Sequence, residues 1–323
     1  MGSFGKLMQQ GERFYNQRQY KQALETFKKA MEIKPKNAEI WNQLGTTYRR
    51  LGRKGEEVNA YKRAIELNPK FAGYLNNLAV TYSNHKEHEK ALETIEKAIS
   101  MSPKKKSLWL GYGYVYLNMG NYDKVVEVSR KGLELNPKYA DLWYNISLAF
   151  LKKKEYENAL SVAKRIIKIE PNYTDSWNCL GYTYYKMGKY DEALEASLKG
   201  LRISKKDHIL LATIGQIYSA LGEYEKAIDY GKKSLEINSY YGPAMVILGI
   251  TYFKMNKIEE AKKYLKAGLF LDSDNVEGFY FLAKVLVELN AFKEALNIIE
   301  RCIELDKDFK DALELKEFIE NSF

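Results

Sequence analysis

The chain has few of the residues that cross-link or interrupt a protein, and it has no long apolar run. It contains two cysteines, six prolines and three histidines among 323 residues. The longest apolar stretch, residues 244–253, contains Gly249 and is too short for the roughly 18–20 residues of a membrane helix. The sequence therefore predicts neither a membrane span nor a disulfide framework.

The cysteines and the first residues bear on the cellular compartment. Cys179 and Cys302 stand 123 residues apart, and we interpret both as small buried side chains in a reducing compartment. Residues 1–6 lack the apolar stretch of a secretory signal. We therefore predict a cytoplasmic protein. Because Gly2-Ser3 resembles a cloning scar, a removed secretion signal upstream stays open.

The positive charge is concentrated in one part of the chain. Residues 1–105 hold 20 Lys or Arg against 11 Glu, a net charge of +9, whereas residues 106–323 hold 31 basic and 31 acidic residues. Net charge does not determine fold, but such asymmetry influences which partners associate. We therefore expect an acidic stretch of a partner to face the first third of the chain.

Large and small residues return along the chain at intervals of 34 residues. A large apolar residue begins the pattern, a small residue follows four positions later, and an aromatic residue follows seven positions later. The large residues are Trp41, Leu75, Trp109, Trp143, Trp177, Leu211, Met245 and Phe279. Such a period is the signature of a repeat architecture.

The order Trp-x-x-Leu-Gly-x-x-Tyr, as at residues 177–184, followed by Ala193, resembles the tetratricopeptide repeat (TPR) family. The resemblance implies an all-α fold, a right-handed superhelical α-solenoid of antiparallel helix pairs. We expect one solenoid over residues 1–323, ending in a capping helix at 310–323. The predicted repeats are 4–37, 38–71, 72–105, 106–139, 140–173, 174–207, 208–241, 242–275 and 276–309.

The physical reason for such stacking lies in the spacing of apolar residues. Each repeat contains two amphipathic blocks of helical period, separated by a glycine-containing or polar turn such as residues 119–121. Small residues at Gly181 and Ala193 allow the two helices of a pair to approach closely. A lone pair cannot bury its apolar surface, so each must pack on the next. The N-terminus has no capping helix of its own, so the presence of a further domain upstream remains an alternative.

One repeat departs from the pattern at a tight contact. Glu57 replaces the expected alanine, and Lys54 replaces the aromatic residue three positions earlier. A buried carboxylate is costly unless it is paired or reaches water. We expect a local loosening that lets Glu57 swing out to water; a weak point between repeats one and three is the alternative.

Catalytic and metal-binding patterns are lacking. His85 and His88 fall in a predicted turn without further Cys or His ligands nearby, so we expect solvated side chains and no metal site. We find no phosphate-binding loop, dinucleotide fingerprint or nucleophile elbow. The sequence predicts that the chain is not an enzyme and binds no cofactor.

The resemblance implies that the first helices of successive repeats line a concave groove. Its predicted character changes from amide and arginine side chains to aromatic and aliphatic ones. The predicted groove residues are Asn42, Arg49, Arg50, Asn76, Leu110, Tyr114, Tyr144, Leu148, Leu151, Asn178, Tyr182, Tyr185, Ile250 and Phe253. Leu148, Leu151 and Ile250 are the least typical of the family and carry most of this prediction. The alternative is generic repeat composition.

The carboxylate clamp by which some family members grip the acidic tails of chaperones is not matched. The clamp needs lysine, arginine and asparagine at set positions, where this chain has Met8, Glu12, Gln43, Gly73 and Asn77. We therefore do not expect chaperone tails as partners.

Nucleic acid is not the expected partner either. Nucleic-acid binding would need the basic clusters at residues 49–50, 53–54 and 104–106 to form a continuous stripe with stacking aromatics. The cluster at 104–106 falls in a predicted turn, and the 34-residue frame is not that of the RNA-reading helical repeats. The resemblance instead implies a non-catalytic scaffold that binds a protein or peptide segment in its concave groove. The alternatives are a recruiting repeat region of a larger enzyme or regulator, and a self-associating assembly module.

Overall fold

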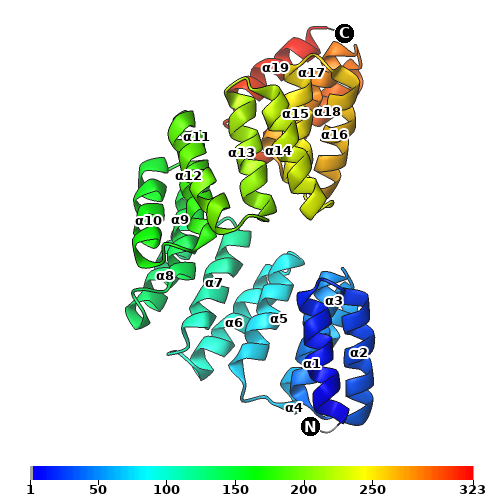
Figure 1. Cartoon of the computed structure of the whole chain (residues 1–323), viewed down its shortest axis with the longest axis vertical. Helices are drawn as coiled ribbons and strands as arrows, with labels where there is room; N and C mark the ends of the chain where they lie inside the picture. The colour runs from blue at the N-terminus through cyan, green and yellow to red at the C-terminus, as the bar shows by residue number, and fades with distance from the viewer. Residues whose placement is uncertain (1–2, 323) are drawn as a thin grey trace. The chain divides into compact units, whose positions relative to one another are not determined.

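A computed structural model of the chain describes residues 3–322, which contain nineteen α-helices and no β-strand (Figure 1). The helices alternate between the first and the second member of a pair. The first helices are α1 (Ser3–Asn16), α3 (Ala38–Arg50), α5 (Ala72–Asn84), α7 (Lys106–Asn118), α9 (Ala140–Lys152), α11 (Thr174–Lys186), α13 (His208–Ala220), α15 (Gly242–Lys254), α17 (Val276–Glu288) and α19 (Lys310–Glu320). The second helices are α2 (Tyr20–Ile33), α4 (Lys54–Leu67), α6 (His88–Met101), α8 (Tyr122–Leu135), α10 (Tyr156–Ile169), α12 (Tyr190–Ile203), α14 (Tyr224–Ile237), α16 (Ile258–Leu271) and α18 (Phe292–Leu305).

The contacts of the chain divide it into two units, residues 1–158 and residues 159–323. Within the first unit, α1 packs on α2, α3 on α4, α5 on α6 and α7 on α8, and each second helix also packs on the next first helix. The second unit repeats this arrangement from α11 to α19. The all-helical fold of consecutive pairs is therefore confirmed, whereas one solenoid over the whole chain stays a prediction.

The first helix of each pair ends in the same way. The residue two positions after the helix has a positive φ, which is +73° at both Gly120 and Gly188. At the first of these ends, the amide of Gly120 donates to the carbonyl of Leu117, and the amide of Asn121 donates to the carbonyl of Tyr116. This pair of bonds is a Schellman motif, which satisfies carbonyls that the helix leaves free.

Small residues hold the two helices of a pair close together. Gly45 of α3 lies against the ring of Tyr61 on α4, and Ala23, Ala91 and Ala193 of second helices are fully buried. Neither Cys179 nor Cys302 forms a disulfide, and both are buried, as the sequence indicates. Burial raises the pKa of Cys302 to about 11, so this thiol stays protonated at neutral pH.

No helix among the described residues is both long enough and apolar enough to cross a membrane.

At the end of the second unit, α19 packs on α18 and buries Ala312 and Ile319 completely. Lys316 of α19 forms an ion pair with Glu300 of α18 at 3.2 Å. Leu313 and Phe318 on the same helix are exposed.

Close backbone approach makes a direct prediction at Gly268 of α16. A Cβ atom there would lie 2.8 Å from the backbone nitrogen of Val246 and 3.0 Å from the carbonyl oxygen of Gly242, so the helices would have to move apart. Gly268→Ala should therefore lower the free energy of unfolding by about 1–3 kcal/mol. Urea unfolding followed by circular dichroism measures this change.

Gly55 of α4 provides the matched control, since a Cβ atom there would meet no atom within 4 Å. Gly55→Ala should leave stability unchanged or raise it by about 0.5 kcal/mol, because alanine loses less backbone entropy in a helix. Equal destabilisation by both substitutions would contradict the close-packing account.

Candidate interaction surface

Most of the predicted groove residues lie on first helices with partly exposed side chains. In the first unit they come from α3, α5, α7 and α9, and in the second unit from α11 and α15. Arg50 is exposed, and the others are partly exposed with one exception. That exception is Ile250, whose relative exposure is 6%.

The prediction that Ile250 contributes an open surface is wrong. Ile250 and Val246 of α15 belong to a buried cluster with Leu265 of α16 and Leu282 of α17. The side chains of Ile250 and Val246 therefore belong to the core of the second unit. Phe253, one turn further along α15, is partly exposed and packs edge-on against Phe281 at a centroid distance of 5.7 Å.

The predicted amides bond mainly to neighbouring first helices. The Nδ2 of Asn77 on α5 donates to the Oδ1 of Asn42 on α3 at 2.8 Å. In the second unit, the Thr213 hydroxyl on α13 donates to the Oδ1 of Asn178 on α11 at 2.7 Å. These bonds tie adjacent pairs together, so much of the amides' bonding capacity is already used within the chain.

Asn76 of α5 also points at a neighbouring helix. Its buried Oδ1 has no hydrogen-bond partner among the described residues, and a Cβ atom at Gly111 of α7 would lie only 2.0 Å from it. Glycine at position 111 therefore leaves the space that the Asn76 amide occupies.

The buried carboxylate of Glu57 forms an ion pair with the partly exposed Arg49. The Nε of Arg49 lies 2.8 Å from the Oε1 of Glu57, and the Thr81 hydroxyl donates to the same oxygen at 2.6 Å. The Nη2 of Arg49 also donates to the Tyr61 hydroxyl at 2.6 Å. Burial raises the pKa of Tyr61, so its hydroxyl stays neutral.

One expectation about this region is therefore wrong. Glu57 does not swing out to water, because it is 3% exposed and its charge is paired by Arg49 across α3 and α4. The guanidinium of Arg49, a predicted groove residue, is held by Glu57 and Tyr61. The signal in the sequence was the arginine eight residues before an unexpected glutamate.

The two turn histidines also differ from expectation. The Nε2 of His85 lies 3.5 Å from the Oε2 of Glu57, and its side chain is only 13% exposed. His88 is the first residue of α6, and its Nδ1 is buried. Within residues 3–322, no cluster of three or more His, Cys, Asp or Glu side chains is arranged to hold a metal ion.

The aromatic and aliphatic part of the predicted surface lies on α7 and α9, which pack side by side in the first unit. Leu110 and Tyr114 of α7 are partly exposed, as are Tyr144, Leu148 and Leu151 of α9. The Tyr114 hydroxyl donates to the Oδ1 of Asn84 on α5 at 2.9 Å, which fixes one edge of this surface.

The second unit presents a more crowded aromatic surface. The rings of Tyr182 and Tyr185 on α11 stack at 6.0 Å, and the Lys186 ammonium lies 5.3 Å and 5.4 Å from their centroids. Burial raises the pKa of Tyr185. The Lys254 ammonium on α15 donates to the carbonyl of Ser219, and burial lowers its pKa.

Family models of the tetratricopeptide repeat match most of the chain. Models described as tetratricopeptide repeat or TPR repeat match residues 11–52, 38–71, 60–93, 106–149, 140–173, 173–239 and 248–308. None of the curated proteins compared with the chain matches it.

Solved structures share the fold at low sequence identity. A tetratricopeptide repeat protein from Parabacteroides merdae has a TM-score of 0.60 and 24% identity, covering 78% of this chain and 99% of that chain. The APC/C hetero-tetramer Cut9-Hcn1 has a TM-score of 0.66 and 16% identity, covering 93% of this chain and 59% of that chain. A thermophilic TPR protein in Thermus thermophilus has a TM-score of 0.51 and 21% identity, covering 56% of this chain and 99% of that chain.

The ion pair of Arg49 and Glu57 predicts an asymmetric response to substitution. Arg49→Ala leaves the Glu57 carboxylate buried without its cation and should lower the free energy of unfolding by about 3 kcal/mol. Glu57→Ala should lower it by only about 1–2 kcal/mol, because the partly exposed Arg49 can reach water. The double variant should resemble Glu57→Ala.

Urea unfolding of the four proteins in this cycle measures the effect, with Arg50→Ala as a control. Arg50 is exposed, so its loss should change stability by no more than about 0.5 kcal/mol. Equal destabilisation by Arg49→Ala and Glu57→Ala would contradict the prediction that the buried Glu57 depends on its partner more than Arg49 does.

Proposed function

Because the chain belongs to the tetratricopeptide repeat family, we propose that it is a non-catalytic scaffold that holds a protein segment against α7 and α9. Repeat arrays of this kind use extended surfaces for protein interactions. The proposal includes a reducing, cytoplasmic setting, which two buried cysteines outside any disulfide favour.

The observation that carries the proposal is the partly exposed surface of leucine and tyrosine on α7 and α9. This surface combines aliphatic and aromatic side chains on neighbouring first helices, namely Leu110, Tyr114, Tyr144, Leu148 and Leu151. Clustered apolar side chains that remain accessible are typical of contact surfaces, and tyrosine is enriched in the centres of such interfaces.

The similarity to Cut9-Hcn1, which is a hetero-tetramer, supports a protein as the partner. Charge supports an acidic segment, since residues 1–105 carry a net charge of +9. Arg50 of α3 is exposed and its Nε donates to the Tyr15 hydroxyl at 3.2 Å. It remains available for long-range attraction, whereas Arg49 is engaged in the ion pair with Glu57.

A photo-crosslinking amino acid placed at position 148 tests this use of the surface. Incorporation there, in cells that make the protein, should yield a discrete crosslinked partner. Leu148→Lys combined with Leu151→Lys should remove that partner from affinity purifications, because lysine side chains resist burial in an apolar contact.

Position 135 supplies the control, because Leu135 on α8 is the same residue type in the same unit and, at 44%, is more exposed than Leu148. The crosslinker at 135 should not capture the same partner, and Leu135→Lys should retain it. Identical capture from both positions, or full retention by the Leu148 and Leu151 variant, would refute the use of the α7 and α9 surface.

A further inference from the structure

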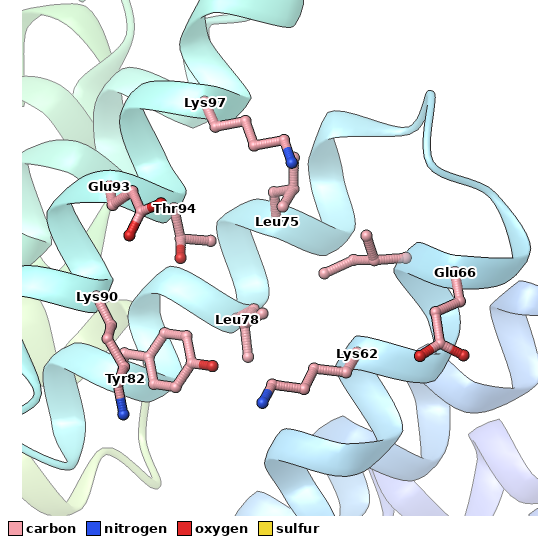
Figure 2. A pocket seen from close by; sticks show the side chains of 10 residues that line it. Lys62, Glu66, Leu75, Leu78, Tyr82, Lys90, Glu93, Thr94 and Lys97 are labelled. Atoms are coloured by element: carbon pink, nitrogen blue, oxygen red, sulfur yellow. The ribbon is translucent and has the colours of Figure 1, made fainter.

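A cavity of about 490 Å³ lies on the second-helix side of the first unit, between α4, α5 and α6 (Figure 2). Its floor is formed by Leu75 and Leu78 of α5, each 5% exposed, and Tyr82 forms part of its wall. Figure 2 shows Lys62 of α4 on one side of the cavity and Thr94 of α6 on the other. None of these residues belongs to the α7 and α9 surface.

Four of the other helix pairs carry a tryptophan ring at the equivalent of Leu75. These tryptophans lie at multiples of 34 residues from Leu75 and are Trp41, Trp109, Trp143 and Trp177. Each indole Nε1 donates to the carbonyl of the proline six residues earlier, at 2.8–2.9 Å. The equivalent carbonyl below Leu75 belongs to Pro69.

In two other pairs, a tyrosine of the second helix supplies an aromatic ring. Tyr230 and Tyr264 stand at the position equivalent to Thr94, and they stack on Tyr218 and Tyr252 at 5.5 Å and 5.4 Å. Tyr218 and Tyr252 are themselves equivalent to Tyr82. The α5–α6 pair, with Leu75 and Thr94, therefore lacks both rings at once. The α1–α2 pair has the same composition, Leu7 and Thr26, but no described pair precedes it.

The chain also shows how a ring would be held in this cavity. Lys199 of α12 lies over the Trp177 ring, 5.9 Å from its centroid. Lys97 of α6 is the equivalent residue, and it lines the cavity beside Leu75. A lysine can rest its aliphatic stem on an apolar floor and move to cover an aromatic face when a ring enters.

The charges at the rim favour an acidic ligand. Lys62, Lys90 and Lys97 line the cavity together with Glu66 and Glu93. Glu66 already forms an ion pair with Arg63 at 2.7 Å, and Lys90 forms one with Glu87. The remaining Lys62 and Lys97 outnumber Glu93, and the surrounding residues 1–105 carry a net charge of +9.

We infer that this cavity binds an aromatic side chain, best an indole, presented by an acidic segment of a partner protein. The ring occupies the place that tryptophan fills in other pairs, and its flanking carboxylates meet Lys62 and Lys97. The site lies on the second-helix side of the first unit, so evidence for or against it does not bear on the α7 and α9 surface.

Leu75→Trp tests the inference by filling the cavity with the chain's own ring. The variant should melt at a higher temperature than the wild type, because the new indole fills space and can donate to the Pro69 carbonyl. A lower melting temperature for both Leu75→Trp and Thr94→Tyr would overturn the inference, since the cavity would then not fit a ring.

Binding is measured with the acetylated, amidated pentapeptide EEWEE and methyl NMR of Leu75, Leu78 and Ile65. The peptide should shift these methyl resonances in the wild type, and Leu75→Trp should weaken binding at least about tenfold. Leu313→Trp is the matched control, because Leu313 holds the same repeat position in α19 and is exposed. It should bind the peptide as the wild type does.

Two further comparisons examine the chemistry of the ligand. Lys97→Ala should weaken binding, whereas Lys131→Ala, at the equivalent position beside Trp109, should not. The peptides EEAEE and KKWKK should bind at least about tenfold more weakly than EEWEE. The inference fails if EEWEE leaves the methyl resonances unchanged, if Leu75→Trp binds it fully, or if N-acetyl-tryptophanamide binds as tightly, which would indicate a small-molecule pocket.

Discussion

The structure depends on the close approach of two helices that cannot bury their apolar faces alone. Gly45 and Gly249 lack a side chain where the two helices of a pair cross closely, so Tyr61 and Leu265 of the partner helices approach the backbone. Each second helix then offers its remaining apolar side to the next first helix. Because every pair relies on its neighbour, a change at one crossing is transmitted to the contact beside it.

The α3–α6 region shows how this arrangement tolerates exceptions. Glu57 occupies a position where α2 and α6 have the buried alanines Ala23 and Ala91. The carboxylate is accommodated because Arg49 supplies a cation and Thr81 supplies a hydroxyl from the next pair. A polar network thus replaces an apolar contact between α3, α4 and α5. A few residues away, Leu75 leaves an apolar space open.

These exceptions separate residues that stabilise the array from residues that remain available to a partner. Asn42, Asn178 and Arg49 are of the types that often contact ligands, yet each forms a hydrogen bond with a neighbouring helix. Leu148 and Leu151 keep part of their surface accessible. The cavity beside Leu75 is available for another reason, because two rings that other pairs contribute are missing there.

The sequence by itself determined the helix pairs, because a 34-residue period of large and small residues has few other physical solutions. It also identified the positions of close contact, such as Gly181 and Ala193. Only the tertiary structure decided which side chains remain accessible, because accessibility depends on neighbours that are distant in sequence. Ile250 is buried by residues of α16 and α17, and Glu57 is paired by a residue of α3. The repeat pattern identifies Leu75 as smaller than the tryptophan of other repeats. The cavity exists because the side chain of Thr94, nineteen residues later, is small as well.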